Sequence, residues 1–292
     1  MLDRPIHIKF HNNQNPLSSF DFIKLENLFD RNNLEHSIYH PQLVEFYMIL
    51  FIQEGTGVHT IDFLEYPYQK GTILTIRKDQ VHQFHPSDTV VGTLLLFTDD
   101  FLVSYLEHLE ALKSVQLFNE ILGIPKIQLK KQGFQEISTL VERIKQEYFK
   151  VNDAYSLGII RSELHILIAK LFRLKANQQP ISTHKKYLHE FIHFQDLVEQ
   201  HAKQYTKVKD YARLMAVSTK TLNNITQTIV HKSAKQFIDD ISIKQIKRLL
   251  INTKLSIKEI AYHSGFEEST NFYKYFKRQT KSTPEQFRST FS

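Results

Sequence analysis

The chain contains no cysteine among its 292 residues. This absence excludes disulfides, thiolate zinc sites, iron–sulfur clusters and thiol nucleophiles, and it is compatible with a reducing compartment. Glycine and proline are also sparse, with 8 residues of each, while 41% of the residues are hydrophobic and 23% are charged. This balance is typical of a soluble globular protein of about two domains, and not of a disordered or fibrous chain.

Long apolar runs are missing as well. The run FYMILFI at residues 46–52 falls far short of the ~20 residues that span a bilayer. The first residues, MLDRPIHIKFHNNQ, carry charges and a proline where a signal peptide has an apolar core. We therefore expect a cytoplasmic protein with no membrane partner.

Positive charge is concentrated in the last third of the chain. Residues 182–292 hold 19 Lys and Arg against 10 Asp and Glu, a net charge of +9. Residues 1–181 hold 18 against 21, a net charge of −3. A clustered positive charge favours a polyanionic partner more strongly than the total of +6 would if it were spread evenly.

The pattern of apolar residues changes along the chain. Residues 44–97 alternate short apolar runs with Gly-containing turns, which predicts antiparallel strands closed into a small barrel or sandwich. After residue 99 the spacing becomes helical, and one predicted helix has an apolar stripe that must be buried on its own barrel or on a partner. The stripe consists of Leu157, Ile160, Leu164, Leu167, Ile168 and Leu171.

The polar segment KANQQPISTHKK at residues 175–186 is typical of a linker, and the net charge changes sign at the same place. We therefore expect an α+β protein with two domains. The predicted parts are an N-terminal domain at 1–174, with a β-barrel at about 20–98 and flanking helices at about 99–174, a linker at 175–186 and an all-α domain at 187–292.

The all-α domain contains an internal repeat. The segment IKEIAYHSGFEESTNFYKYFKRQ at residues 257–279 matches a segment 49 residues upstream in its first half and 50 residues upstream in its second half, which indicates a one-residue insertion. Each copy predicts a short helix, a tight turn and a second helix, the helix-turn-helix arrangement. In the second copy Ser256 and Glu259 form a capping box, and Gly265 supplies a left-handed residue at the turn.

The second helix of each copy leaves one face bare, because Leu222, Ile225, Phe272 and Phe276 point inward. Its polar side chains are suited to base edges, and nearby cations are suited to phosphates. The bare side chains are Thr219, Lys220, Thr221, Asn223 and Asn224 in the first copy and Ser269, Thr270, Asn271, Tyr273 and Lys274 in the second. The candidate phosphate contacts are Lys244, Lys247, Lys277, Arg278, Lys281 and Arg288.

Two other interpretations of this region stay open. Any solvated helix face carries polar side chains, and a basic helical domain can bind nucleic acid without sequence preference. The repeat, the positive charge and a long helix predicted at about 234–252 between the copies favour a specific DNA-binding unit instead.

Residues 257–288 resemble the C-terminal signature of the AraC/XylS family of transcription regulators. The residues that carry the resemblance are Ile257, Ile260, Ala261, Gly265, Phe266, Phe272, Phe276, Lys277, Pro284, Phe287 and Arg288. The chain departs from the family pattern at His231 and Lys281, where glycine is usual, at Ala234, where proline is usual, and at Ser242 and Ile246. The resemblance implies a seven-helix domain that lays two recognition helices into successive major grooves of double-stranded DNA, with RNA polymerase as a further partner. By position in the family, it implies these base contacts: Lys220, Thr221, Asn223, Asn224, Ser269, Thr270, Asn271 and Lys274.

The strand-rich region resembles, more loosely, the cupin-like sensor domain at the N-terminus of many such regulators. This resemblance implies a possible small-molecule effector and a homodimer formed through the helix at 157–171. A barrel interior could form a pocket or simply be filled by its side chains. The candidate pocket residues are Phe46, Met48, His59, Ile76, His82 and Phe84.

A cupin can also be a metalloenzyme with an accessory DNA-binding tail, which is the alternative function. Metal-binding cupins offer a His-x-His pair, whereas His59 has Gly57 and Ile61 at the paired positions. Although His82 and His85 follow later in the chain, we predict no metal, no cofactor and no enzymatic activity. The expected function is therefore that of a sequence-specific transcription regulator, an activator or a repressor.

Overall fold

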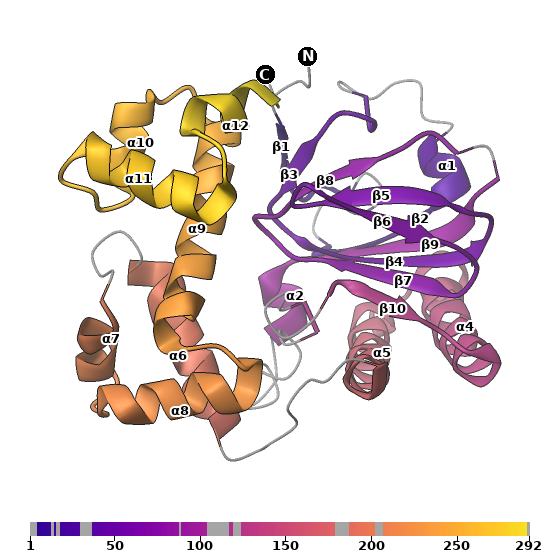
Figure 1. The fold of residues 1–292 in the computed structure, drawn as a ribbon. Helices are drawn as coiled ribbons and strands as arrows, with labels where there is room; N and C mark the ends of the chain where they lie inside the picture. Colours follow the sequence, from indigo (N-terminus) through magenta and orange to yellow (C-terminus); the bar gives the residue numbers. More distant parts are fainter. Residues whose placement is uncertain are drawn as a thin grey trace. The chain divides into compact units, whose positions relative to one another are not determined.

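The computed structural model describes residues 5–12, 15, 18–29, 37–87, 89–103, 117–118, 124–178, 187–201 and 207–290. Within these residues the chain forms two compact units, one up to Gln178 and one from Tyr187 onward. Figure 1 shows a sheet-rich first unit and a helical second unit. This is the α+β class that the sequence predicts.

In the described residues, the first unit contains two five-stranded sheets. One sheet has the order β1-β3-β8-β5-β6 and the other has the order β10-β7-β4-β9-β2. Neighbouring strands are antiparallel except for β1 and β3. The strands are β1 (Ile6–Ile8), β2 (Phe20–Lys24), β3 (Gln42–Val44), β4 (Tyr47–Glu54), β5 (Gly57–Ile61), β6 (Leu64–Tyr68), β7 (Thr72–Ile76), β8 (Val81–Phe84), β9 (Val91–Phe97) and β10 (Lys126–Gln128).

The central strand β4 is apolar at consecutive positions because both of its faces are buried. Met48, Leu50 and Ile52 belong to the core between the two sheets. Tyr47, Ile49 and Phe51 belong to a second core, where helices cover the outer face of the sheet. The continuous run FYMILFI therefore reflects a strand between two apolar layers.

Helices complete this unit, and α4 and α5 lie against the outer face of the sheet that contains β4 and β7 (Figure 1). Among the described residues, the helical segments of this unit are α1 (Leu25–Phe29), α2 (Asp99–Val103), α4 (Lys131–Gln146), the π-helical turn η1 (Glu147–Val151) and α5 (Ser156–Gln178). Ile160, Leu164 and Leu171 of α5 are at most 1% exposed in the same core. The predicted apolar stripe thus packs on its own sheet and not on a partner subunit.

Three boundaries differ from the prediction. The sheets gain β1 before residue 20 and β10 after residue 98, because both short strands bond to edges that the local sequence pattern does not reveal. Helix α5 continues through residues 175–178 of the predicted linker, where Lys175 is buried and donates a hydrogen bond to the carbonyl of Leu117 at 3.0 Å. Most of the helical pattern at 101–122, and the rest of the linker, lie outside the described residues.

The second unit consists of seven helices in the residues that the structure describes, as the resemblance implies. They are α6 (Leu188–His201), α7 (Val208–Leu214), α8 (Thr219–Val230), α9 (Ala234–Asn252), α10 (Ile257–His263), α11 (Ser269–Thr280) and α12 (Pro284–Thr290). The long helix α9 joins the two helix-turn-helix copies (Figure 1). Among the described residues, no helix is both long and apolar enough to cross a membrane.

Candidate nucleic-acid interface

The two helix-turn-helix copies have the same backbone at their turns. Ala216 and Gly265 occupy matching positions, and their φ angles are +52° and +81°. The next residue in each copy donates its N–H to the carbonyl five positions earlier, from Val217 to Ala212 at 2.9 Å and from Phe266 to Ala261 at 3.0 Å. This is the bonding of a Schellman-type helix end, which turns the chain sharply into the next helix.

The one-residue insertion lies just after these turns. Helices α7 and α10 are offset by 49 residues, whereas α8 and α11 are offset by 50 residues. Ser218 is the N-cap of α8, and its side chain accepts the N–H of Thr221. The capping box of Ser256 and Glu259 at α10 is also confirmed.

Each copy is anchored by buried side chains from both of its helices. In the first copy, Tyr211 and Leu222 are 0% exposed, and Tyr211 packs edge-on against Phe194 of α6. In the second copy, Phe272 and Phe276 are 0% exposed and share a core with Ile260 and Ala261. These anchors set which face of α8 and α11 points to solvent.

Lys220 and Asn224 lie on the exposed face of α8, and Thr221 is half-buried with its hydroxyl 2.8 Å from the Ser218 hydroxyl. Asn223 has a different role. Its Nδ2 donates to the carbonyl of Thr219 at 3.0 Å, and its Oδ1 accepts the N–H of Ala234, the first residue of α9, at 2.9 Å. Asn223 therefore fastens α9 to α8, in place of the base contact predicted from the sequence.

On α11, Thr270, Asn271 and Lys274 are exposed and Ser269 is half-buried, so the four predicted positions reach the surface together. Neither α8 nor α11 contains an aspartate or glutamate. A polar face without carboxylates suits DNA, because a carboxylate near the phosphates would be repelled. Both second helices thus offer donors and acceptors with no opposing negative charge of their own.

The predicted phosphate contacts divide into two groups. Lys277, Arg278 and Lys281 are exposed at the end of α11 and just after it, whereas Lys244 and Lys247 are half-buried on α9. The ammonium group of Lys247 lies 5.3 Å from the centre of the Phe287 ring.

Arg288, the last of the predicted phosphate contacts, donates hydrogen bonds to backbone carbonyls of its own unit. Its Nε donates to the carbonyl of Leu250 at 2.9 Å, and one terminal nitrogen donates to the carbonyl of Leu255 at 2.7 Å. These bonds tie α12 to the end of α9 and to the loop before α10. The phosphate contact predicted at this position is therefore replaced by a structural role.

In the sheet unit, the six predicted pocket residues are all buried, and Phe46, Met48, Ile76 and Phe84 belong to the core between the two sheets. His59 of β5 and His82 of β8 are stacked, with Nε2 of His59 3.3 Å from Nδ1 of His82, and both rings contact Phe84. The structure thus favours the filled-interior alternative at these residues.

The two histidines are neutral at neutral pH. Burial and the neighbouring His82 hold the pKa of His59 well below its ordinary value, and burial lowers the pKa of His82 to about 3. Nδ1 of His59 and Nε2 of His82 have no hydrogen-bond partner among the described residues. Within that part of the chain, no three His, Asp or Glu side chains converge as a metal site would require.

Comparison with known proteins decides the family. The model of the AraC-like ligand binding domain matches residues 28–155, and the model of a helix-turn-helix domain matches residues 211–290. The chain belongs to the AraC family of transcriptional regulators. As a member of the AraC family, it combines an N-terminal ligand-binding domain with a C-terminal helix-turn-helix DNA-binding domain.

Relatives of this AraC-family regulator align along most of their length. The Msm operon regulatory protein of Streptococcus mutans is 26% identical over 284 residues, which cover 92% of this chain and 98% of the relative. The HTH-type transcriptional activator RhaS of Escherichia coli O157:H7 is 21% identical over 244 residues, which cover 84% and 85%. Fatty-acid-bound ToxT of Vibrio cholerae aligns over 84% of this chain and 87% of ToxT, at 17% identity and a TM-score of 0.42.

Proposed function

We propose that this AraC-family protein binds specific DNA sites by placing α8 and α11 in successive major grooves. The observation that carries the proposal is the duplicated helix-turn-helix, whose second helices expose polar, carboxylate-free faces. The joining helix α9 has 19 residues and is therefore about 28 Å long. This length is close to the ~34 Å of one DNA turn, which supports binding of both helices on one side of the duplex.

Within this proposal, the base contacts are Lys220, Thr221, Asn224, Ser269, Thr270, Asn271 and Lys274, and the phosphate contacts are Lys244, Lys247, Lys277, Arg278 and Lys281. The N-terminal domain would adjust which sites are occupied, in response to an effector or to dimerisation. RNA polymerase would be the partner through which a bound regulator acts, in the cytoplasm. An effector can shift DNA occupancy only if its affinity differs between two states of the protein.

The homodimer expected from the family needs a different face of α5 from the one predicted. The inward stripe is already buried, but an opposite stripe lies in solvent with spacings of four, three, four, three and four residues. It consists of Tyr155, which directly precedes α5, and of Ile159, Ser162, Ile166, Ala169 and Arg173 within the helix. Tyr155 is 76% exposed, and Ile159 and Ile166 are 45% and 44% exposed. This spacing is that of a helix that packs along another helix, so a second copy of α5 is the proposed occupant.

Selection of bound sequences from random DNA tests the DNA proposal. We expect a motif with two separated half-sites, and Asn271→Ala should lose about 1–3 kcal/mol of discrimination at particular base pairs of the α11 half-site. Lys277→Ala should weaken binding to all sequences. It should also reduce, by about 1, the slope of the logarithm of the binding constant against the logarithm of the salt concentration. Affinities for the selected site and for scrambled DNA, measured at several salt concentrations, distinguish the two effects.

Asn224→Ala and Asn223→Ala form a matched pair for the first helix. Asn224→Ala should change base preference and leave the urea midpoint unchanged, whereas Asn223→Ala should lower the midpoint because it frees the start of α9. Binding without any selected motif would refute the proposal in favour of a non-specific binder. Tightly bound stoichiometric metal that is lost in His59 or His82 variants would instead favour the metalloenzyme alternative.

A further inference from the structure

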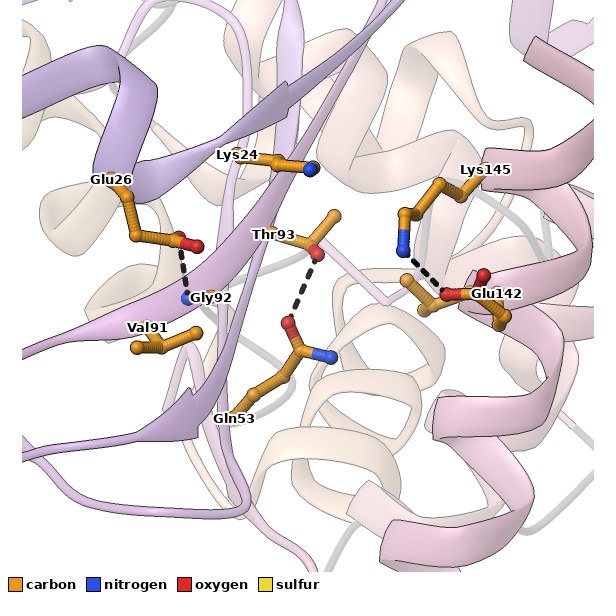
Figure 2. Close-up of a pocket in the computed structure, with 9 residues that line it drawn as sticks. Lys24, Glu26, Gln53, Val91, Gly92, Thr93, Glu142 and Lys145 are labelled. Atoms are coloured by element: carbon orange, nitrogen blue, oxygen red, sulfur yellow. Dashed lines mark hydrogen bonds and ion pairs between the residues drawn. The ribbon is translucent and has the colours of Figure 1, made fainter. Parts of the chain in front are cut away.

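The outer face of the β4 sheet contains a pocket that is separate from the buried histidines. It has a volume of about 190 Å³ and lies between the start of β9 and helix α4. Its lining residues come from β2, α1, β4, β9 and α4. They are Lys24, Glu26, Gln53, Val91, Gly92, Thr93, Val141, Glu142 and Lys145. Figure 2 shows the side chains of Lys24, Thr93 and Lys145 around a common space, with Glu26 turned toward Gly92.

The shape of the pocket depends on irregular backbone at the edge of the sheet. The pairing of β4 with β9 shifts register between Ile52 and Glu54, so that Gln53 is the extra residue of a bulge. A bulge changes the direction in which a side chain leaves its strand. Gly92 has no room for a side chain, because a Cβ atom there would lie 2.6 Å from the carbonyl oxygen of Phe51. Gln53 and Gly92 both line the pocket.

The two carboxylates and the Gln53 amide of the pocket each accept one hydrogen bond. One oxygen of Glu26 accepts the N–H of Gly92 at 3.2 Å, and one oxygen of Glu142 accepts a hydrogen bond from Lys145 at 2.8 Å. The Lys145 bond also lowers the pKa of Glu142, which keeps this carboxylate ionised. The amide oxygen of Gln53 accepts from the Thr93 hydroxyl at 3.3 Å, and Thr93 is only 4% exposed.

Some of the donor N–H groups, by contrast, have no partner among the described residues. Within the part of the chain that the structure describes, Lys24 makes no hydrogen bond or ion pair, and Gln53 uses only its amide oxygen. Lys145 donates one of its three N–H groups to Glu142. Two ammonium groups and an amide therefore face the same space, and a ligand with negatively charged oxygens would satisfy them.

We propose that this pocket binds a small organic anion through a carboxylate or phosphate group held by Lys24 and Lys145. The volume of the pocket corresponds to about six water molecules, which suits a molecule of a few carbon atoms. Charge-assisted hydrogen bonds from two lysines would hold the anionic group, and Val91 and Val141 would contact the carbon atoms.

The position of the pocket gives the ligand a route to regulation, and this part of the inference rests on the proposed function. A bound anion links Lys24 of β2 to Lys145 of α4, and α4 packs on α5 in one core. Helix α5 carries the exposed stripe of the proposed dimer. An anion that binds one position of α4 more tightly than another would shift the population of the proposed dimer. The occupancy of DNA sites would then change with it.

Calorimetric titration of the full chain tests the site, with inorganic phosphate and succinate as probes and erythritol as the uncharged control, all at constant ionic strength. We expect saturable binding of at least one anion and none of erythritol. Lys24→Gln and Lys145→Gln should each weaken binding by about tenfold or more. Lys131→Gln, at the exposed start of α4, should leave affinity unchanged.

A further variant separates the site from a general effect of charge. Glu142→Gln retains both lysines and frees Lys145, so it should bind the preferred anion more tightly than the unmodified protein. No saturable binding of either anion up to about 10 mM, or equal affinity in Lys24→Gln, would overturn the proposal. Selection from random DNA in the absence of anions tests the proposed function separately, because Lys24→Gln should recover the same motif.

Discussion

Single residues at the ends of helices determine the geometry of both helix-turn-helix copies. Gly265 adopts its left-handed conformation without steric cost, whereas Ala216 adopts the same conformation with a Cβ atom. His231 and Lys281, which end α8 and α11, also have positive φ angles of +55° and +65°. These two positions are the ones where the family usually has glycine, so the turns keep their shape despite the substitutions.

Exchanging the residues at the two matched turns should change stability in opposite directions. Ala216→Gly should raise the free energy of unfolding by about 0.5–1 kcal/mol, and Gly265→Ala should lower it by about 1 kcal/mol, because a left-handed backbone disfavours a side chain. Urea unfolding of the full chain, followed by circular dichroism, measures both values. A loss of stability in Ala216→Gly would show that something other than the backbone angle controls this turn.

The pairing of strands β5 and β8 buries two histidines and thereby determines their protonation state. His59 lies on β5 and His82 lies on the neighbouring strand β8, and the register of these strands places Phe84 opposite His59. Two imidazoles in an apolar core stay neutral, because a charge there would lose its hydration. Their burial therefore makes the stability of the sheet unit depend on pH.

Acidification should destabilise the sheet unit through these two histidines. Their pKa values are lower in the folded chain than the ordinary 6.5, so their contribution is complete above pH 6.5 and is lost as the pH falls. Each histidine should remove about 1.4 kcal/mol of stability per pH unit below that value, and for His82 the loss continues to about pH 3. Urea midpoints between pH 7 and pH 5 measure the slope.

His82→Gln serves as the test variant for this slope, and His11→Gln, at an exposed position, serves as its control. The slope should become shallower in His82→Gln and stay the same in His11→Gln, whatever the absolute stability of either variant. An unchanged slope in His82→Gln would mean that other groups cause the acid sensitivity.

At the scale of the whole molecule, the proposed dimer would give the two faces of α5 separate tasks. The inward face completes the core of the sheet unit, and the outward face remains available to a second chain. In an antiparallel pair centred near Ser162, Ile159 of one subunit would lie opposite the partner subunit's Ile166. Dimer formation would then leave the fold of each subunit unchanged.

Ile166→Glu should convert the dimer to a monomer, because it places two charges in an apolar helix contact. The free energy of unfolding of the subunit should change by less than about 0.5 kcal/mol, since this side chain is 44% exposed. Light scattering coupled to size-exclusion chromatography measures the mass, and Gln132→Glu on the exposed part of α4 controls for added charge. A dimer that persists in Ile166→Glu would exclude this face as the interface.

The sequence by itself determined the features that depend on neighbouring residues. The two domains, the helix-turn-helix repeat, the capping box of Ser256 and Glu259, the left-handed Gly265 and the inward Phe272 and Phe276 were all predictable from it. Caps, tight turns and helical periodicity involve residues only a few positions apart, so their physical causes are visible in a short segment.

Only the tertiary structure decided how side chains far apart in the chain are used. It assigned Asn223 to the start of α9 and Arg288 to the carbonyls of Leu250 and Leu255, and it buried the predicted stripe of α5 on its own sheet. It also brought Lys24 and Lys145 into one pocket across about 120 residues of chain. An asparagine that is free in solvent and one that is hydrogen-bonded to another helix look the same in sequence. The hydrogen-bond partner that distinguishes them comes close only when the elements pack.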